Sequence, residues 1–129
     1  MKKSIFALIS VMFLAACGMS IEEKADKEAK DFTRKNCPTP VVNCQCTDSI
    51  VFNSHTRTFI NYCRFFDVLD DEKFISSKKD DINKELDNAV ANNYGMKTFV
   101  DEGFTFEYII RSASNPKKVL LQHKVKLKK

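Results

Sequence analysis

Glycine and histidine are scarce in this chain of 129 residues, and both shortages narrow the chemistry that it offers. There are only three glycines, and two of them, Gly95 and Gly103, stand where helices should end, so the sequence has no Gly-rich loop for phosphate. Neither of the two histidines has a nucleophile or a carboxylate fixed beside it by spacing. Asp70-Asp71 offers an acid and a base by residue type, but adjacent acids in a polar run are usually solvated. We therefore expect no enzyme, no cofactor and no metal ion.

A long apolar run is also missing. The longest, from Ile5 to Ala16, would rise about 18 Å as a helix, against a hydrocarbon core of about 30 Å. It follows Lys2 and Lys3 and closes on small residues, which is the layout of a secretory signal. Its end, Leu14-Ala15-Ala16-Cys17, resembles the lipobox of bacterial lipoproteins at all four positions. The resemblance implies cleavage before Cys17, a diacylglycerol on its sulfur and an acylated amino group, and hence a membrane partner reached through this anchor.

The predicted signal peptide covers residues 1–16 and leaves 113 residues, enough for one domain with a modest core. Within this domain, 17–129, residues 17–20 would be a short tether. Gly18 rather than aspartate follows Cys17, which in enteric-type lipoproteins implies the outer membrane, while the leaflet stays open. A signal peptide without lipidation is the alternative. We expect a lipid-anchored protein of the cell envelope, in the outer membrane.

The hydrophobic pattern predicts an α+β domain in the order helix, β-hairpin, helix, β-hairpin, with an antiparallel sheet and helices packed on one face. A capping box at Ser20 should start the first helix, which ends before Pro38. Two strand-like runs around a turn at 53–56 form the first hairpin. A second cap at Ser77 would start the next helix, and the alternating run 104–111 opens the second hairpin.

Four cysteines follow Cys17, an even number that suits disulfides in an oxidising compartment. Closing the first hairpin at its predicted turn places Phe52 opposite Arg57. The same register places Cys46 opposite Cys63, within disulfide reach. We therefore predict a Cys46–Cys63 bond across the hairpin.

The other two cysteines, Cys37 and Cys44, would then close the proline-containing loop after the first helix. Two alternatives use the same side chains. The four thiolates could hold zinc, although paired C-x₂-C knuckles are absent, and Cys44-x-Cys46 could act as a redox dithiol, although no thioredoxin-like context surrounds it.

Positive charge is concentrated at the C-terminal end, where residues 117–129 hold six lysines and no acid. Without Lys2 and Lys3 the whole-chain charge of +4 falls to about +2, so we expect no nucleic-acid partner. Alternation places Lys124, Lys126 and Lys128 on the outer side of the last strand, as a patch for anionic headgroups or lipopolysaccharide. Protection of an exposed strand edge is the alternative. His123 shares the inward side of this strand and is expected to be structural.

Several segments resemble a loose group of small, uncharacterised exported bacterial proteins. The shared features are a Cys-Pro after a first helix, as at Cys37-Pro38, an aromatic strand, and the run Gly103-Phe104-Thr105-Phe106-Glu107-Tyr108 after a helix. The likeness covers about residues 32–110, and the additional cysteines depart from it. Because the function of the group is not established, the resemblance assigns no functional residues.

These observations favour a non-enzymatic binding or accessory module, lipid-anchored and presented to a protein partner in the envelope. An envelope inhibitor or immunity-type lipoprotein, which blocks a site on another protein, is the alternative. A small thiol-redox or hydrolytic enzyme is the third hypothesis, and no cluster of catalytic residue types favours it.

Overall fold

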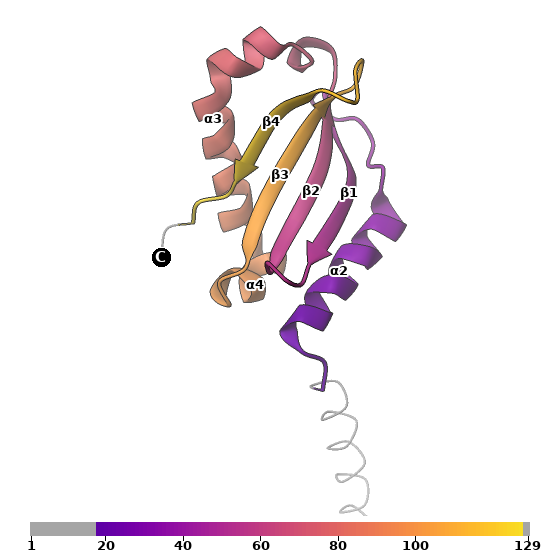
Figure 1. Cartoon of the computed structure of the whole chain (residues 1–129), viewed down its shortest axis with the longest axis vertical. Coiled ribbons are helices and arrows are strands. Elements are labelled where there is room, and N and C mark those ends of the chain that lie inside the picture. The colour runs from indigo at the N-terminus through magenta and orange to yellow at the C-terminus, as the bar shows by residue number, and fades with distance from the viewer. Residues whose placement is uncertain (1–17, 128–129) are drawn as a thin grey trace, which may run out of the picture.

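The computed structural model describes residues 18–127, so the predicted signal peptide 1–16, the lipidation site Cys17 and Lys128 lie outside the described residues. The domain is α+β, as predicted. In chain order its elements are α2 (Ile21–Asn36), β1 (Gln45–Asn53), β2 (Thr58–Phe65), α3 (Glu72–Ala91), α4 (Lys97–Asp101), β3 (Thr105–Ser112) and β4 (Val119–Lys124), with short 3₁₀ turns at Asp67–Leu69 and Tyr94–Met96 (Figure 1).

The four strands form one sheet in the order β1-β2-β3-β4, and the sheet is mixed rather than antiparallel. Each hairpin is antiparallel, as predicted, but β2 and β3 pair in parallel. The reason is the length of α3, whose 20 residues rise about 30 Å and return the chain to the end of the sheet where β2 began. The two hairpins therefore meet along a parallel junction in the centre of the sheet.

The first hairpin has a different register from the predicted one, because its turn lies one residue later in the chain. Asn53 is the last residue of β1, and its side-chain oxygen accepts hydrogen bonds from the N–H groups of His55 and Thr56. Phe52 therefore lies opposite Phe59, not opposite Arg57. An irregularity at residue 48 shifts the pairing again further along.

α2 begins as predicted, because the hydroxyl of Ser20 accepts the N–H of Glu23 at 3.1 Å. Two ion pairs join successive turns of this helix, Asp26–Lys30 at 2.7 Å and Lys27–Asp31 at 2.8 Å. The helix ends at Asn36, before Pro38.

α3 begins five residues before the predicted cap at Ser77. The carboxylate of Asp71 accepts the N–H groups of Lys73 and Phe74 at 2.9 and 3.1 Å, and so caps the helix. The helix ends at Ala91, before Gly95, which lies in a 3₁₀ turn. Gly103 has a φ of +79° and separates α4 from β3, as its position predicted.

The core lies between one face of the sheet and the three helices. A cluster of phenylalanine rings from β1, β2, the β3 end and α4 surrounds Phe59, and small side chains of α2 close it. A second cluster packs α3, through Ile75, against β2, β3 and β4. None of the helices in residues 18–127 has the length and apolar character needed to cross a membrane.

Candidate functional site

α2 and α3 cover opposite margins of the same sheet face and leave a strip of sheet between them. α2 packs against β1 and α3 approaches the sheet on the β4 side (Figure 1). Two adjoining cavities of about 520 and 320 Å³ occupy the strip, and Thr47, Ala89 and Tyr108 line both of them. We call this continuous hollow the α2–α3 groove. It runs from the loop before β1 to the end of α3.

The floor of the groove comes from the two central strands, on both sides of their parallel junction. Phe59 lies beside Phe106 in the register, with ring centroids 5.4 Å apart, and Asn61 lies beside Tyr108. Cys63 continues the floor toward the loop. A floor made mostly of rings, with an amide and a hydroxyl among them, is typical of a site that binds apolar groups in a fixed orientation.

Exposed apolar side chains stand on the rim of the groove. Phe32 of α2 is 38% exposed, and Val42, in the loop before β1, is 59% exposed. Ala89 of α3 is also exposed and leaves space above the floor. Large apolar residues that gather around a hollow, rather than scattering over the surface, favour a binding site.

The groove is almost uncharged. Burial raises the pKa of Cys63 to about 11 and the pKa of Tyr108 to about 12, so both side chains are neutral at physiological pH. Glu85 is the charged residue among those that line the two cavities, and it forms no ion pair within the described part of the chain. The groove therefore offers an apolar floor and one carboxylate at the end nearest the loop.

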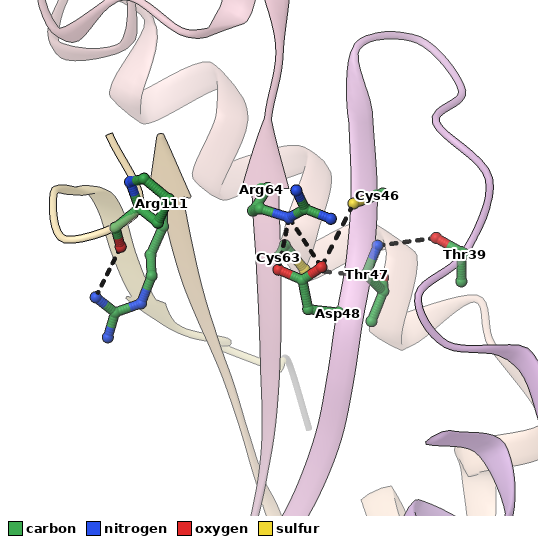
Figure 2. A network of polar contacts seen from close by, with 8 residues as sticks. Thr39, Cys46, Thr47, Asp48, Cys63, Arg64 and Arg111 are labelled. Carbon is green, nitrogen blue, oxygen red and sulfur yellow. Dashed lines mark hydrogen bonds and ion pairs between the residues drawn. The ribbon is translucent and has the colours of Figure 1, made fainter. Parts of the chain in front are cut away.

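A polar network lies beside the groove, at the irregular end of β1 (Figure 2). Both carboxylate oxygens of Asp48 accept Nε–H of Arg64, at 2.9 and 2.8 Å, and this hydrogen bond raises the pKa of Arg64. The thiol of Cys46 lies 3.8 Å from the same carboxylate. The guanidinium of Arg64 also lies over the ring of Phe66. Each charged member has a partner, so the network holds β1 to β2 rather than presenting a free charge.

The four described cysteines are free thiols, and the two predicted pairings are not formed. The register that predicted Cys46–Cys63 is wrong: Cys46 lies opposite Arg64 and Cys63 lies opposite Thr47. Because side chains of successive residues point to opposite faces of a sheet, Cys46 and Cys63 lie on different faces. Burial raises the pKa of both thiols.

The predicted lysine patch is only partly on the strand. β4 ends at Lys124, which is exposed, while Lys126 follows the strand and Lys128 is outside the described residues. β4 is an edge strand, as the edge-protection alternative requires. His123 points inward, as predicted, with its Nε2 2.7 Å from Oδ1 of Asp87.

Asp87, on α3, is partly buried beside the end of β4. Burial acts to raise the pKa of Asp87, but the hydrogen bonds from His123 and from the backbone N–H of Lys126 outweigh it and leave the pKa below its usual range. An ionised carboxylate only accepts hydrogen bonds, so Nε2 of His123 is the donor. The pair holds the segment after β4 against α3.

The adjacent acids Asp70 and Asp71 have different hydrogen-bond partners and different structural roles. Asp71 caps α3, whereas Asp70 accepts hydrogen bonds from the N–H and hydroxyl of Ser114 at 2.9 and 2.6 Å. The hydroxyl of Ser112, together with these bonds from Ser114, lowers the pKa of Asp70. Within residues 18–127, no group of three or more His, Cys, Asp or Glu side chains is arranged to hold a metal ion.

Sequence reasoning missed the groove. The one signal in the sequence was the thin apolar stripe of α2, where only Ala25 and Ala29 are buried. A helix with so narrow a stripe covers only the edge of a sheet, and part of the sheet face stays open.

Comparison with known proteins shows the family and the fold. A family described as a domain of unknown function (DUF8479) matches residues 20–121. A crystal structure of a Pseudomonas aeruginosa protein that is assigned as secreted superimposes with a TM-score of 0.63, over 82% of this chain and 93% of that one. The two sequences are 12% identical, so the likeness shows the fold alone. No curated protein matches the chain at a significant level.

Proposed function

The chain belongs to the DUF8479 family, and we propose that it is a lipid-anchored, non-enzymatic accessory protein of the bacterial envelope that binds an apolar segment of an envelope protein. The observation that carries the proposal is the α2–α3 groove. Its two joined cavities form an elongated site, which suits several consecutive side chains of a peptide better than one compact molecule.

The chemistry of the groove defines the segment that it would bind. Apolar side chains would lie on the floor around Phe59 and Phe106, and Asn61 and Thr47 would meet polar groups of the bound backbone. A lysine or arginine near one end of the segment would pair with Glu85. We therefore expect a mostly apolar partner segment with a basic residue at one end.

The thiols support a binding role over a redox one. A nucleophilic cysteine needs a lowered pKa, and burial raises the pKa of Cys37, Cys46 and Cys63. These thiols are therefore mostly protonated at neutral pH and react slowly, although the carboxylate of Asp48 lies 3.8 Å from the thiol of Cys46.

Export and anchoring rest on Leu14-Ala15-Ala16-Cys17 and on the secreted assignment of the P. aeruginosa protein with the same fold. The mature N-terminus should be an acylated Cys17. Mass spectrometry of the protein extracted from outer membranes would test this, because Cys17→Ser should abolish the lipid adduct and release the protein from the membrane. An unmodified Cys17, or a protein that remains membrane-bound after the substitution, would contradict the anchor.

Two alanines of α3 give a matched test of the groove. Ala89 lines the groove and Ala91 lies on the other side of the same helix, and both are exposed, so arginine at either position should be compatible with folding. A photo-crosslinking amino acid in place of Val42, on the rim, would be used in the lipid-anchored protein in intact cells. We expect a discrete crosslinked partner that Ala89→Arg removes and Ala91→Arg retains.

Crosslinking that is equal in the two variants would rule out the groove as the binding site. The identity of the crosslinked protein would separate the two binding hypotheses, because a lytic enzyme or a toxin as partner would favour an inhibitor or immunity-type lipoprotein. Any other stoichiometric envelope protein would favour the accessory role.

A further inference from the structure

The loop between α2 and β1 is held along the free edge of β1 at two points. The hydroxyl of Thr33, on α2, both donates to the C=O of Ile50 and accepts its N–H, each at 2.9 Å. Further along, the N–H of Thr39 donates to the C=O of Thr47 at 3.0 Å, and the hydroxyl of Thr39 accepts the N–H of Thr47 at 2.9 Å. The chain from residue 33 to residue 39 thus runs beside residues 50 to 47 of β1.

Cys37 lies between these two points of attachment. Its N–H donates to the C=O of Thr33 as the C-cap of α2, which leaves the residue opposite the stretch of β1 that contains Asp48. The charge of Asp48 and the charge of the Cys46 thiolate both add to the raised pKa of Cys37, after burial. These contributions agree with the placement of Cys37 opposite Asp48, which the two points of attachment give.

Cys46 occupies the same neighbourhood from the strand side. Its thiol lies 3.8 Å from Oδ1 of Asp48, on the side of β1 that faces Arg64 (Figure 2), and the residue is 5% exposed. Asp48 is thus a common neighbour of the two thiols, one on the loop and one on the strand.

The other two cysteines are less suited to pair with Cys46. Cys63 is also near this group, since the charges of Cys46, Asp48 and Cys37 add to its raised pKa, after burial. Its side chain, however, points to the opposite face of the sheet, where the thiol lies 3.8 Å from the hydroxyl of Thr47. Cys44 has a φ of +63° in the tight turn between Val42 and Gln45, and its carbonyl accepts the N–H of Phe66. A bond between Cys44 and Cys46, two residues apart, would distort this turn.

We propose that Cys37 and Cys46 form a disulfide when the protein meets a disulfide-bearing oxidant, and that this bond fastens the loop to β1. The two thiols lose two protons and two electrons as the S–S bond forms, and the disulfide of the oxidant is reduced to two thiols. Glutathione disulfide is the oxidant for the experiment, and an envelope thiol oxidase carries out the same exchange in the cell. Cys63 remains a buried thiol.

The bond also bears on the groove, because the loop that it fastens supplies one wall through Thr39, Pro40 and Val42. This consequence rests on the proposed function. The bond itself does not, since it is detected by mapping and by stability without any partner.

Digestion with trypsin would show which cysteines are joined, because it separates Cys63 from the other three described cysteines. Cleavage after Lys35, Arg57 and Arg64 places Cys37, Cys44 and Cys46 in one peptide and Cys63 in another. The full chain, purified with its anchor in detergent, would be treated with glutathione disulfide, alkylated, digested without reduction and analysed by mass spectrometry, together with its Cys37→Ser, Cys44→Ser, Cys46→Ser and Cys63→Ser variants.

We expect peptide 36–57 to carry an internal disulfide and one alkylated cysteine. The bond should persist in Cys44→Ser and Cys63→Ser and disappear from Cys37→Ser and Cys46→Ser. Oxidation should raise the Tm by about 5–10 °C in the variants that keep the bond, because closing a short loop restricts the unfolded chain.

Three results would overturn the proposal. They are alkylation of all the cysteines after oxidation, a linkage that joins the two tryptic peptides through Cys63, and an internal bond that survives in Cys37→Ser or in Cys46→Ser. The mapping does not depend on partner binding, so a failure of the groove experiment leaves this result unaffected.

Discussion

Single acidic side chains hold together parts of the chain that are distant in sequence. Asp87 on α3 binds His123 and the backbone of Lys126, and Asp70 binds the turn that contains Ser114. Asp48 holds Arg64 across the first hairpin. Each of these carboxylates accepts more than one hydrogen bond, and for Asp70 and Asp87 these bonds hold the pKa below its usual range.

The contact between Asp87 and His123 should make the stability of the protein depend on pH. Asp87→Ala should lower the free energy of unfolding at pH 7 by about 1–3 kcal/mol, because His123 and the N–H of Lys126 lose their acceptor. The folded pKa of Asp87 lies below its unfolded value, so its contribution is present above about pH 4 and is lost as the pH falls through the folded pKa. Urea unfolding between pH 7 and pH 2.5 would measure both effects.

The matched control is Asp81→Ala, because Asp81 is exposed on the same helix and makes no side-chain contact in the described part of the chain. Its stability should follow that of the wild type at every pH. Equal losses in the two variants, or a difference for Asp87→Ala that persists unchanged to pH 2.5, would contradict the assigned role.

At the scale of the elements, the two edge strands of the sheet, β1 and β4, are protected from strand addition in different ways. The free edge of β1 is covered, because α2 and the loop after it supply hydroxyl and amide partners to Ile50 and Thr47. β4, the other edge, ends on exposed Lys124 and is followed by exposed Lys126. Covering an edge and placing charge beside it are two ways of preventing another chain from adding a strand.

Thr33→Val tests the cover on β1. Valine has nearly the same shape but leaves the N–H and C=O of Ile50 without partners, so we expect a loss of about 1–3 kcal/mol in the free energy of unfolding. The amide of Ile50 should also exchange with solvent faster. Thr98→Val, the same change at an exposed helical position, is the control. A Thr33→Val protein as stable as the control would show that the edge does not depend on this hydroxyl.

At the scale of the whole molecule, Phe59 on β2 is the side chain at which both hairpins and the crossover between them pack together. Its ring contacts those of Phe52 on β1, Phe106 on β3 and Phe99 on α4, with centroids 5.0 to 5.4 Å apart. Both hairpins and the crossover between them therefore meet at one buried side chain.

Phe59→Ala should cost about 3–5 kcal/mol, because it removes a buried ring and leaves a cavity. Phe74→Ala, at a 40% exposed position on α3, should cost far less. The measurement is urea unfolding with the m-value fitted, since an unchanged m-value attributes the shift in midpoint to stability alone. Similar losses in the two variants would argue that the ring cluster is not the centre of the core.

Features set by near neighbours could be predicted from the sequence. The Ser20 cap, the position of Gly103 and the strand over the alternating run 104–111 depend on residues within one turn or one strand, and all three are as predicted. The burial in β3 departs from strict alternation, because Glu107 is also buried. The parallel junction was not predicted because it depends on where a long crossover returns the chain. The disulfide register failed for two reasons. The turn lies one residue later than predicted, with the side chain of Asn53 hydrogen-bonded inside it, and this moves the partner of each β1 residue by two positions along β2. The irregularity between Thr47 and Ser49 then shifts the pairing by one residue and turns Cys46 to the face opposite that of Cys63.

The parallel junction between β2 and β3 also sets an order of assembly. Each hairpin closes between strands that adjoin in sequence, whereas the junction requires the whole segment from Phe66 to Phe104 to fold back first. The floor of the groove takes one half from each side of this junction, Phe59 and Asn61 from β2 and Phe106 and Tyr108 from β3. Neither hairpin carries a binding surface by itself, so a partner can engage only a chain that has completed its slowest pairing.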